Sequence, residues 1–190
     1  SMYRNAMKLN KLISRIIDFR KLESGKLKLE PQSLNLVTFC KDLTVDYEAL
    51  CQQKNIIFHF LPSRTIIRVE FDPEKMEILL SNLISNAFKY TPEGGKIVLS
   101  IDETDEKVTL VVEDNGIGIQ KEFQEVIFDR FFQIENTEIF STGDGIGLSF
   151  VKHLVELHDG TIRVESELNK GAKFIVELPK KERVDEPVSS

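Results

Sequence analysis

The sequence predicts an α+β fold built as a two-layer α/β sandwich, in which a mixed, mostly antiparallel sheet packs on helices and a bundle helix precedes it. Apolar residues recur at helical spacing in some segments and alternate with polar residues in others. These two kinds of segment are interleaved without a regular strand-helix-strand repeat, which disfavours a doubly wound parallel sheet. Hydrophobic residues make up 41% of the 190 residues, enough for one core of ordinary size.

Charge and composition exclude several classes of protein. A net charge of -6, with 29% charged residues, disfavours surfaces that follow nucleic-acid phosphates or anionic membranes, so we expect no nucleic-acid partner. No apolar run is long enough to span a membrane, and the N-terminus lacks a signal peptide, so we expect a soluble, cytoplasmic domain. Cys40 and Cys51 lack the spacing of metal ligands and are expected to be buried free thiols.

The first elements are a bundle helix and an extended segment. Residues 2–24 contain no Pro or Gly, and their apolar residues recur at spacings of four and three, which is typical of a helix-bundle seam. Gly25 ends this helix, and the stretch from Leu27 to Leu36 alternates as extended structure does. We therefore predict a bundle-helix piece at 1–25, a globular domain at 26–179 and a charged tail or linker at 180–190.

The middle of the chain predicts two helices and two strands. A helix is expected at residues 38–53, followed by strands at 55–60 and near 65–70. The next helix has a well-marked start, with Asp72 as the N-cap, Pro73 at the first helical position and Glu74 in the first turn. It is expected to run to about Tyr90.

The second half predicts two strand pairs around two helices. Residues 96–102 and 107–113 are rich in Val, Ile and Leu and form a predicted hairpin. Residues 122–132 are predicted to be helical, 133–144 to be a polar loop and 146–157 to be an apolar helix. Two final strands are expected at 161–167 and 172–178.

Three constellations carry chemistry, and the first lies on the helix that follows Asp72. Its apolar stripe leaves Asn82, Asn86 and Lys89 on an adjoining face. An amide oxygen is a hard ligand for magnesium, and a lysine neutralises phosphate oxygens. The alternative is that these are ordinary solvated helix residues.

The other two constellations are glycine motifs. Asp114 ends a predicted strand and is followed by Gly116 and Gly118, so its carboxylate is able to accept a hydrogen bond from an exocyclic amine such as that of adenine, while the glycines allow close approach of a flat base. Gly143, Gly145 and Gly147 run into a helix, whose N-terminal N–H groups suit phosphate. Each motif alone is equally compatible with an ordinary turn, and neither is a dinucleotide fingerprint or a Walker loop.

The order of these motifs resembles the N, first-glycine, F and second-glycine boxes of sensor histidine kinases. The F box would be Phe128-Asp129-Arg130-Phe131-Phe132, and the resemblance spans about residues 5 to 179. It implies the Bergerat ATP-binding fold, preceded by the end of the dimerisation helix. It also implies a role in two-component signal transduction, with the γ-phosphoryl group of ATP transferred to a histidine for relay to a response regulator.

The resemblance implies a role for each residue. Asn86 would hold Mg²⁺, Asn82 would support the metal or its water, Lys89 would meet phosphate and Arg130 would contact the γ-phosphate. The segment from Phe128 to Thr142 would form a mobile lid. The nucleotide would be bound by Asn86, Lys89, Tyr90, Asp114, Gly116, Gly118, Phe131, Gly143, Gly145, Gly147 and Leu148.

The phosphoacceptor box of the family has no match in this chain. His59, His153 and His158 lack its context and are expected to be structural or exposed, so the accepting histidine is absent from this fragment. The implied partners are a response regulator receiver domain and a second copy in a full-length homodimer, with any membrane contact made by regions outside this chain.

Two departures from the family pattern leave alternatives open. Asp144 stands where the family often has a small hydroxyl residue, and Ala172 where Ser or Thr is common. Asp144 therefore keeps open a degenerate nucleotide-binding scaffold module. A clamp-type ATPase, such as a chaperone or type II topoisomerase subunit, shares the implied fold, but Asn82 occupies the position where those proteins tend to place a catalytic Glu.

Overall fold

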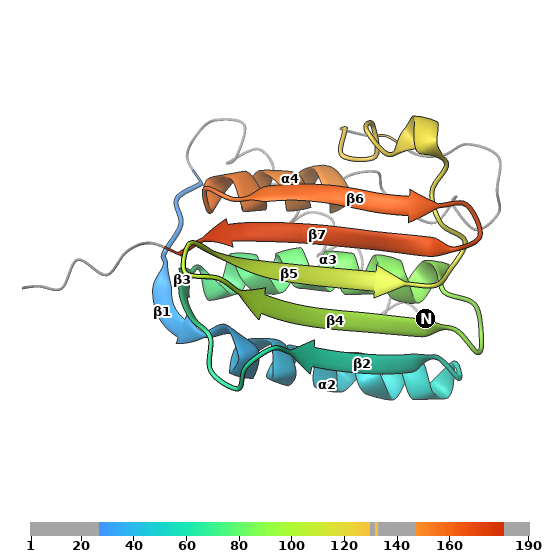
Figure 1. The fold of residues 1–190 in the computed structure, drawn as a ribbon, viewed down its shortest axis with the longest axis horizontal. Helices are drawn as coiled ribbons and strands as arrows, with labels where there is room; N and C mark the ends of the chain where they lie inside the picture. Colours follow the sequence, from blue (N-terminus) through green and yellow to red (C-terminus); the bar gives the residue numbers. More distant parts are fainter. Residues whose placement is uncertain (1–26, 130–131, 133–146, 181–190) are drawn as a thin grey trace, which may run out of the picture. The chain divides into compact units, whose positions relative to one another are not determined.

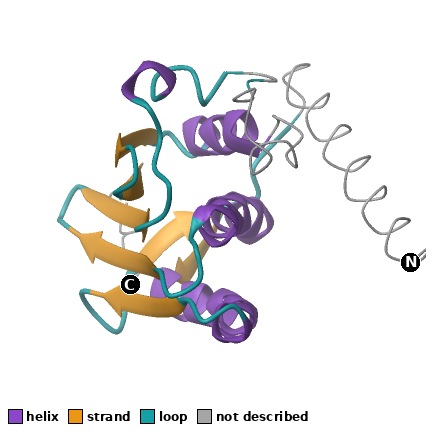
Figure 2. Ribbon diagram, turned by 90° about the vertical axis from the view of Figure 1, so that its right-hand side faces the viewer, coloured by secondary structure: helices purple, strands orange, loops and turns teal. Residues whose placement is uncertain are grey.

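The computed structural model describes residues 27–129, 132 and 147–180. In this part of the chain, three helices lie on one face of a five-stranded sheet (Figures 1 and 2). They are α2 (Leu36–Gln53), α3 (Pro73–Tyr90) and α4 (Gly147–Leu157), and α3 lies between the other two. The predicted two-layer α/β sandwich is therefore confirmed.

The large sheet is mixed and mostly antiparallel, with strand order β2-β4-β5-β7-β6. Only the pairing of β2 with β4 is parallel among the described strands. A separate antiparallel pair joins β1 to β3. The strands are β1 (Gln32–Asn35), β2 (Ile57–Pro62), β3 (Arg68–Phe71), β4 (Lys96–Glu103), β5 (Lys107–Asp114), β6 (Thr161–Glu167) and β7 (Gly171–Pro179).

The core lies between the helices and the sheet, and α3 is its centre. Asp72 caps α3 as predicted, with its Oδ1 accepting a hydrogen bond from the Lys75 N–H at 3.1 Å. Ile84 is fully buried although it lies outside the predicted apolar stripe. The stripe itself is buried as expected, and its residues are Met76, Leu79, Leu80, Leu83 and Ala87. Because α3 packs against the sheet and has a helix on either side, a wider arc of its surface is covered than an amphipathic pattern predicts.

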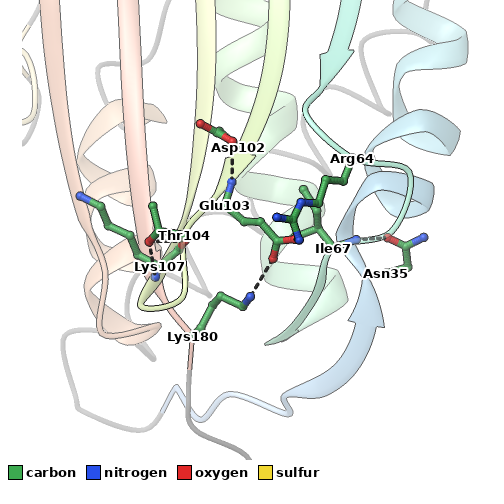
Figure 3. Close-up of polar contacts among 8 residues, drawn as sticks. All are labelled: Asn35, Arg64, Ile67, Asp102, Glu103, Thr104, Lys107 and Lys180. Carbon is green, nitrogen blue, oxygen red and sulfur yellow. Dashed lines mark hydrogen bonds and ion pairs between the residues drawn. The ribbon is translucent and has the colours of Figure 1, made fainter.

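The start of α2 corrects one prediction. Leu36, expected to be extended, is the first residue of the helix, two residues earlier than the predicted start at Thr38. Asn35 explains the shift, because its Oδ1 accepts hydrogen bonds from the Val37 N–H at 3.2 Å and from the Ile67 N–H at 3.0 Å (Figure 3). The second bond comes from a residue far along the chain.

The next two strands, β2 and β3, begin later than predicted. β2 begins at Ile57 because Asn55 takes a left-handed backbone conformation, with φ 53°, which completes the turn after α2. β3 begins at Arg68 and not near Thr65. The remaining predicted strands agree with the observed ones to within one residue at each end.

The helix predicted at residues 122–132 is wrong. Only a short 3₁₀ turn, Lys121–Phe123, forms there, followed by irregular turns up to Asp129. Tertiary contacts hold the segment instead: Gln124 Nε2 donates to the carbonyl oxygens of Ile119 at 3.0 Å and Ser166 at 2.8 Å. The Phe128 ring packs edge-on to that of Phe174, with centroids 6.3 Å apart.

An ion-pair cluster closes the end of the sheet opposite Asp114. Glu103, with a side chain only 8% exposed, contacts Arg64 at 3.2 Å and Lys180 at 2.7 Å (Figure 3). It thus ties the loop after β2 and the residue that follows β7 to the β4–β5 turn.

The predicted bundle helix at 1–25 and the tail beyond Lys180 lie outside the described residues.

The cysteines and histidines match their predicted roles. Cys40 and Cys51 are buried free thiols, and burial raises the pKa of Cys40 to about 12. His158 is buried: its Nε2 accepts the Asp72 N–H at 3.1 Å, so its Nδ1 carries the proton and donates to the Leu154 carbonyl at 2.7 Å. His59 is exposed on β2, and His153 lies partly exposed on α4.

Among the helices of the described residues, none combines the length and the apolar composition that a membrane-spanning helix needs.

Candidate functional site

The candidate site lies where the C-terminal end of α3 meets the loop after β5 and the first described residues of α4. Asn82 of α3 is 8% exposed, and its Nδ2 donates to the Ile78 carbonyl at 2.7 Å, which fixes the amide. Its Oδ1 faces Gly147 so closely that a Cβ placed there would lie 3.1 Å away. Two motifs that are 65 positions apart in the sequence are therefore in contact.

The remaining polar residues of α3 lie toward its C-terminal end. Asn86 is partly exposed, and no other described residue forms a hydrogen bond with its amide. Lys89 Nζ donates to the Tyr90 hydroxyl at 2.9 Å and lies 4.7 Å from the centroid of that ring. The last turn of α3 thus presents an amide oxygen, an ammonium and a phenol ring.

Asp114, the last residue of β5, is a buried carboxylate with 7% exposure. Burial raises its pKa, and the N–H groups of Gly116 and Ala172 partly offset that effect. The Gly116 N–H donates to Oδ1 at 2.8 Å. In the described ranges no lysine or arginine pairs with this carboxylate, so it retains acceptor capacity at the edge of the core.

Glycines allow three segments to meet around Asp114. A Cβ on Gly116 would collide with the Tyr90 carbonyl, and one on Gly118, which has φ +67°, would collide with the Glu167 carbonyl. Gly171, with φ +99°, packs directly on the Asp114 carbonyl. Gly171 lies between the strands predicted at 161–167 and 172–178, and its position after Asn169-Lys170 was the available sequence signal.

Backbone hydrogen bonds hold the loop after β5 in place. The Ile117 N–H donates to the Tyr90 carbonyl at 3.3 Å, and the Ile117 carbonyl accepts the Asn169 N–H at 2.7 Å. The Ile119 N–H donates to Ser166 Oγ at 2.8 Å. The loop is therefore attached to α3 on one side and to the β6–β7 turn on the other.

Most of the predicted site residues have a described position. Asn82, Asn86, Lys89 and Tyr90 share α3; Asp114, Gly116 and Gly118 meet its end; Gly147 contacts Asn82, and Leu148 follows it on α4. Phe128 packs on β7, and Phe132 on Phe123 with centroids 5.6 Å apart. Arg130, Phe131, Gly143, Gly145 and the remainder of the predicted lid lie outside the described residues, as does Asp144.

Sequence and structure comparisons agree on a family. The family described as histidine kinase-, DNA gyrase B- and HSP90-like ATPase matches residues 71–182. Histidine kinase P4 of Formosa agariphila is 38% identical over 92% of the chain, and hybrid signal transduction histidine kinase D of Dictyostelium discoideum is 34% identical over 96%. The chain spans only 13% and 12% of the length of these two relatives.

A solved structure provides the same match at the level of the fold. The catalytic domain of histidine kinase ThkA superposes with a TM-score of 0.73 and 32% identity, covering 81% of this chain and 100% of that one. The chain therefore belongs to the family of histidine kinase-, DNA gyrase B- and HSP90-like ATPases. Within this family, the sequence relatives and the ThkA structure are histidine kinases, and the chain corresponds to their ATPase domain.

Proposed function

We propose that this domain binds Mg-ATP at the site around Asp114 and transfers the γ-phosphoryl group to a histidine outside this chain, for relay to a response regulator. The observation that carries the proposal is the buried Asp114 carboxylate, which is held by backbone N–H groups with no described cation beside it. A carboxylate with no described cation beside it is a strong acceptor for a neutral N–H donor such as the exocyclic amine of adenine, because that hydrogen bond is charge-assisted.

The glycines and Tyr90 would complete the base and phosphate sites. Gly116 and Gly118 let the loop after β5 pack on the Tyr90 and Glu167 carbonyls next to Asp114, and Tyr90 would line the pocket. Gly147 and Leu148 would lie close to the phosphates, because Gly147 contacts Asn82 on the polar face of α3. Phe131, Gly143 and Gly145 are proposed to cover the nucleotide, and Arg130 to contact the γ-phosphate.

The donor set also fits a magnesium ion held largely by the nucleotide. Among the described residues, no three His, Cys, Asp or Glu side chains are grouped so as to hold a metal. Magnesium in nucleotide sites takes few protein ligands and is completed by phosphates and water. The Asn86 Oδ1, which accepts no hydrogen bond from another described residue, would therefore suffice as the protein ligand. When bound, the ion would neutralise phosphate charge, and Lys89 and Asn82 would act beside it.

The partners follow from the class of protein. ThkA has been solved in complex with the response regulator protein TrrA, and that structure matches 95% of this chain at 28% identity with a TM-score of 0.72. We propose a response regulator receiver domain as the partner of this domain, and a homodimer as the state of the full-length protein, whose other regions would make any membrane contact. A cytoplasmic location is proposed on the same basis.

Incubation with labelled ATP tests the proposal directly. The chain should bind Mg-ATP in calorimetry and yet gain no acid-labile phosphohistidine, because His158 is buried with both ring nitrogens engaged, and His59 and His153 lack an acceptor context. A longer protein that also contains the natural sequence preceding this chain should be phosphorylated on one histidine of that preceding sequence.

The same experiment separates the alternatives. Binding without labelling of the extended chain would favour a nucleotide-binding scaffold module. Labelling of His59, His153 or His158 in the short chain would contradict the proposed transfer to an outside histidine, and an absence of ATP binding would remove the function altogether.

The magnesium ligand has its own test. Asn86→Ala should lower the affinity for ATP by about tenfold in the presence of Mg²⁺, because one hard oxygen ligand is lost. In EDTA the variant and the parent chain should bind ATP equally. Ser85→Ala, at the exposed neighbouring position on α3, is the control. An equal loss for Asn86→Ala with and without Mg²⁺ would show that Asn86 contacts the nucleotide and not the metal.

A further inference from the structure

The turn between α2 and β2 is joined to the loop that follows α3. Asn55 Nδ2 donates to Glu93 Oε1 at 2.6 Å, and the Asn55 carbonyl accepts the Gly94 N–H at 3.0 Å. The Ile57 N–H donates to the Gly95 carbonyl at 2.9 Å. Residues 54–57 therefore follow the loop at 91–95 closely, although no motif in the sequence marks either segment.

Lys54 in this turn caps the C-terminal end of α3. Its Nζ donates to the carbonyls of Phe88 and Thr91, each at 3.1 Å, and lies 4.9 Å from the centroid of the Phe88 ring. The last carbonyls of a helix lack partners within the helix, and the negative end of the helix dipole favours a cation. Because Lys54 is partly buried with three contacts, its position is fixed, unlike that of a solvated surface lysine.

The segment held by Lys54 is also the wall of the proposed nucleotide site. Between Phe88 and Thr91 lies Tyr90, whose carbonyl accepts the Ile117 N–H and packs against Gly116. The Gly116 N–H in turn holds the Asp114 carboxylate. Two backbone contacts therefore link the residues capped by Lys54 to the Asp114 carboxylate, which we propose accepts a hydrogen bond from the adenine amine.

We propose that Lys54 is a positioning residue for the nucleotide site: it fixes the last turn of α3, and through the Tyr90 carbonyl it sets the position of Gly116 and the orientation of Asp114. Lys54 does not itself contact the nucleotide. The inference rests on the proposed function for its effect on ATP, but the link from Lys54 to the loop after β5 stands on the contacts alone.

The test compares Lys54→Met with Lys54→Arg. The methionine variant keeps the length and apolar contact of the side chain but removes the donor, so Mg-ATP affinity should fall by about tenfold at a temperature where it remains fully folded. In NMR spectra, the amide resonances of Gly116 and Ile117 should shift in the nucleotide-free protein. Arginine, which also donates to two carbonyls from a cationic group, should recover most of both properties.

Lys107→Met is the matched control, since it removes a lysine that pairs with Glu177 at 2.6 Å. Lys107 alternates with the buried Val108 on β5, so it lies on the face of the sheet away from the described helices. The substitution should leave ATP affinity within about twofold of the parent and the Gly116 and Ile117 amides unmoved. Unmoved amides in Lys54→Met would overturn the proposal, and so would unchanged ATP affinity in a parent that binds ATP. If the parent does not bind ATP, the proposed function fails, while the amide shifts still decide the role of Lys54.

Discussion

Replacing Asp114 by asparagine should weaken Mg-ATP binding by about tenfold to a hundredfold, because losing a charge-assisted hydrogen bond in a partly dry pocket costs about 1.5 to 3 kcal/mol. The amide oxygen of asparagine still accepts the Gly116 N–H, so the loop after β5 should remain in place. Isothermal titration calorimetry on the folded variant measures the loss. Unchanged affinity would remove Asp114 from the site.

The empty protein should not lose stability through this change. Burial raises the pKa of Asp114 in the folded state, so the folded protein holds this proton more tightly than the unfolded chain does. Asp114 therefore contributes stability at low pH, and that contribution is lost as pH rises through the raised pKa. At neutral pH the buried, ionised carboxylate destabilises the folded state. Asp114→Asn should therefore unfold at an equal or higher denaturant concentration than the unsubstituted protein.

Glu113→Gln provides the matched control for Asp114→Asn. Glu113 is the neighbouring residue on β5 and carries the same charge, but its side chain is exposed on the opposite side of the strand. It should leave ATP affinity within about twofold, since screened surface charges contribute little. Equal losses in the two variants would indicate a general electrostatic effect in place of a specific hydrogen bond.

Among glycine-to-alanine substitutions in the described part of the chain, Gly171→Ala should be the most destabilising. Gly171 has φ +99°, a conformation that costs an L-residue about 1 to 2 kcal/mol, and its Cβ would overlap the Asp114 carbonyl. Because both partners are backbone, relief requires separating β7 from the end of β5, and we expect a total loss of about 3 kcal/mol or more. Urea unfolding gives the free energy of unfolding.

Gly94→Ala separates backbone strain from collision. Gly94 also has a positive φ, +79°, but nothing lies within 4 Å of its Cβ position. It should cost only the conformational penalty, about 1 kcal/mol. Similar losses for Gly171→Ala and Gly94→Ala would show that β7 moves freely away from Asp114 and that the close approach has no energetic weight.

Local sequence patterns determined much of the fold. The start of α3 was predictable because the Asp72 cap, Pro73 and Glu74 act within one turn of backbone. The β4–β5 hairpin and the last two strands were predictable because alternation sets which face of a strand is buried. The order of the polar and glycine motifs was also sufficient to indicate the ATPase family, which the comparisons confirm.

Other features depended on residues far apart in the chain. The helix predicted at 122–132 did not form because Gln124 and Phe128 satisfy their contacts with β6 and β7 instead of with their own turn. The start of α2 moved because Asn35 also receives the Ile67 N–H. Neither competing contact leaves a periodic signal in the segment it changes.

The site shows the same division. The sequence alone was enough to predict which residues carry the chemistry, because an amide, an ammonium and a carboxylate keep their ligand preferences wherever they lie. Only the tertiary structure decided that Asn82 faces Gly147, that Gly171 packs on Asp114 and that Lys54 caps the helix bearing Asn86. Such contacts depend on how the helices and strands pack in space, and side-chain packing between distant segments has no spacing in the sequence that would reveal it.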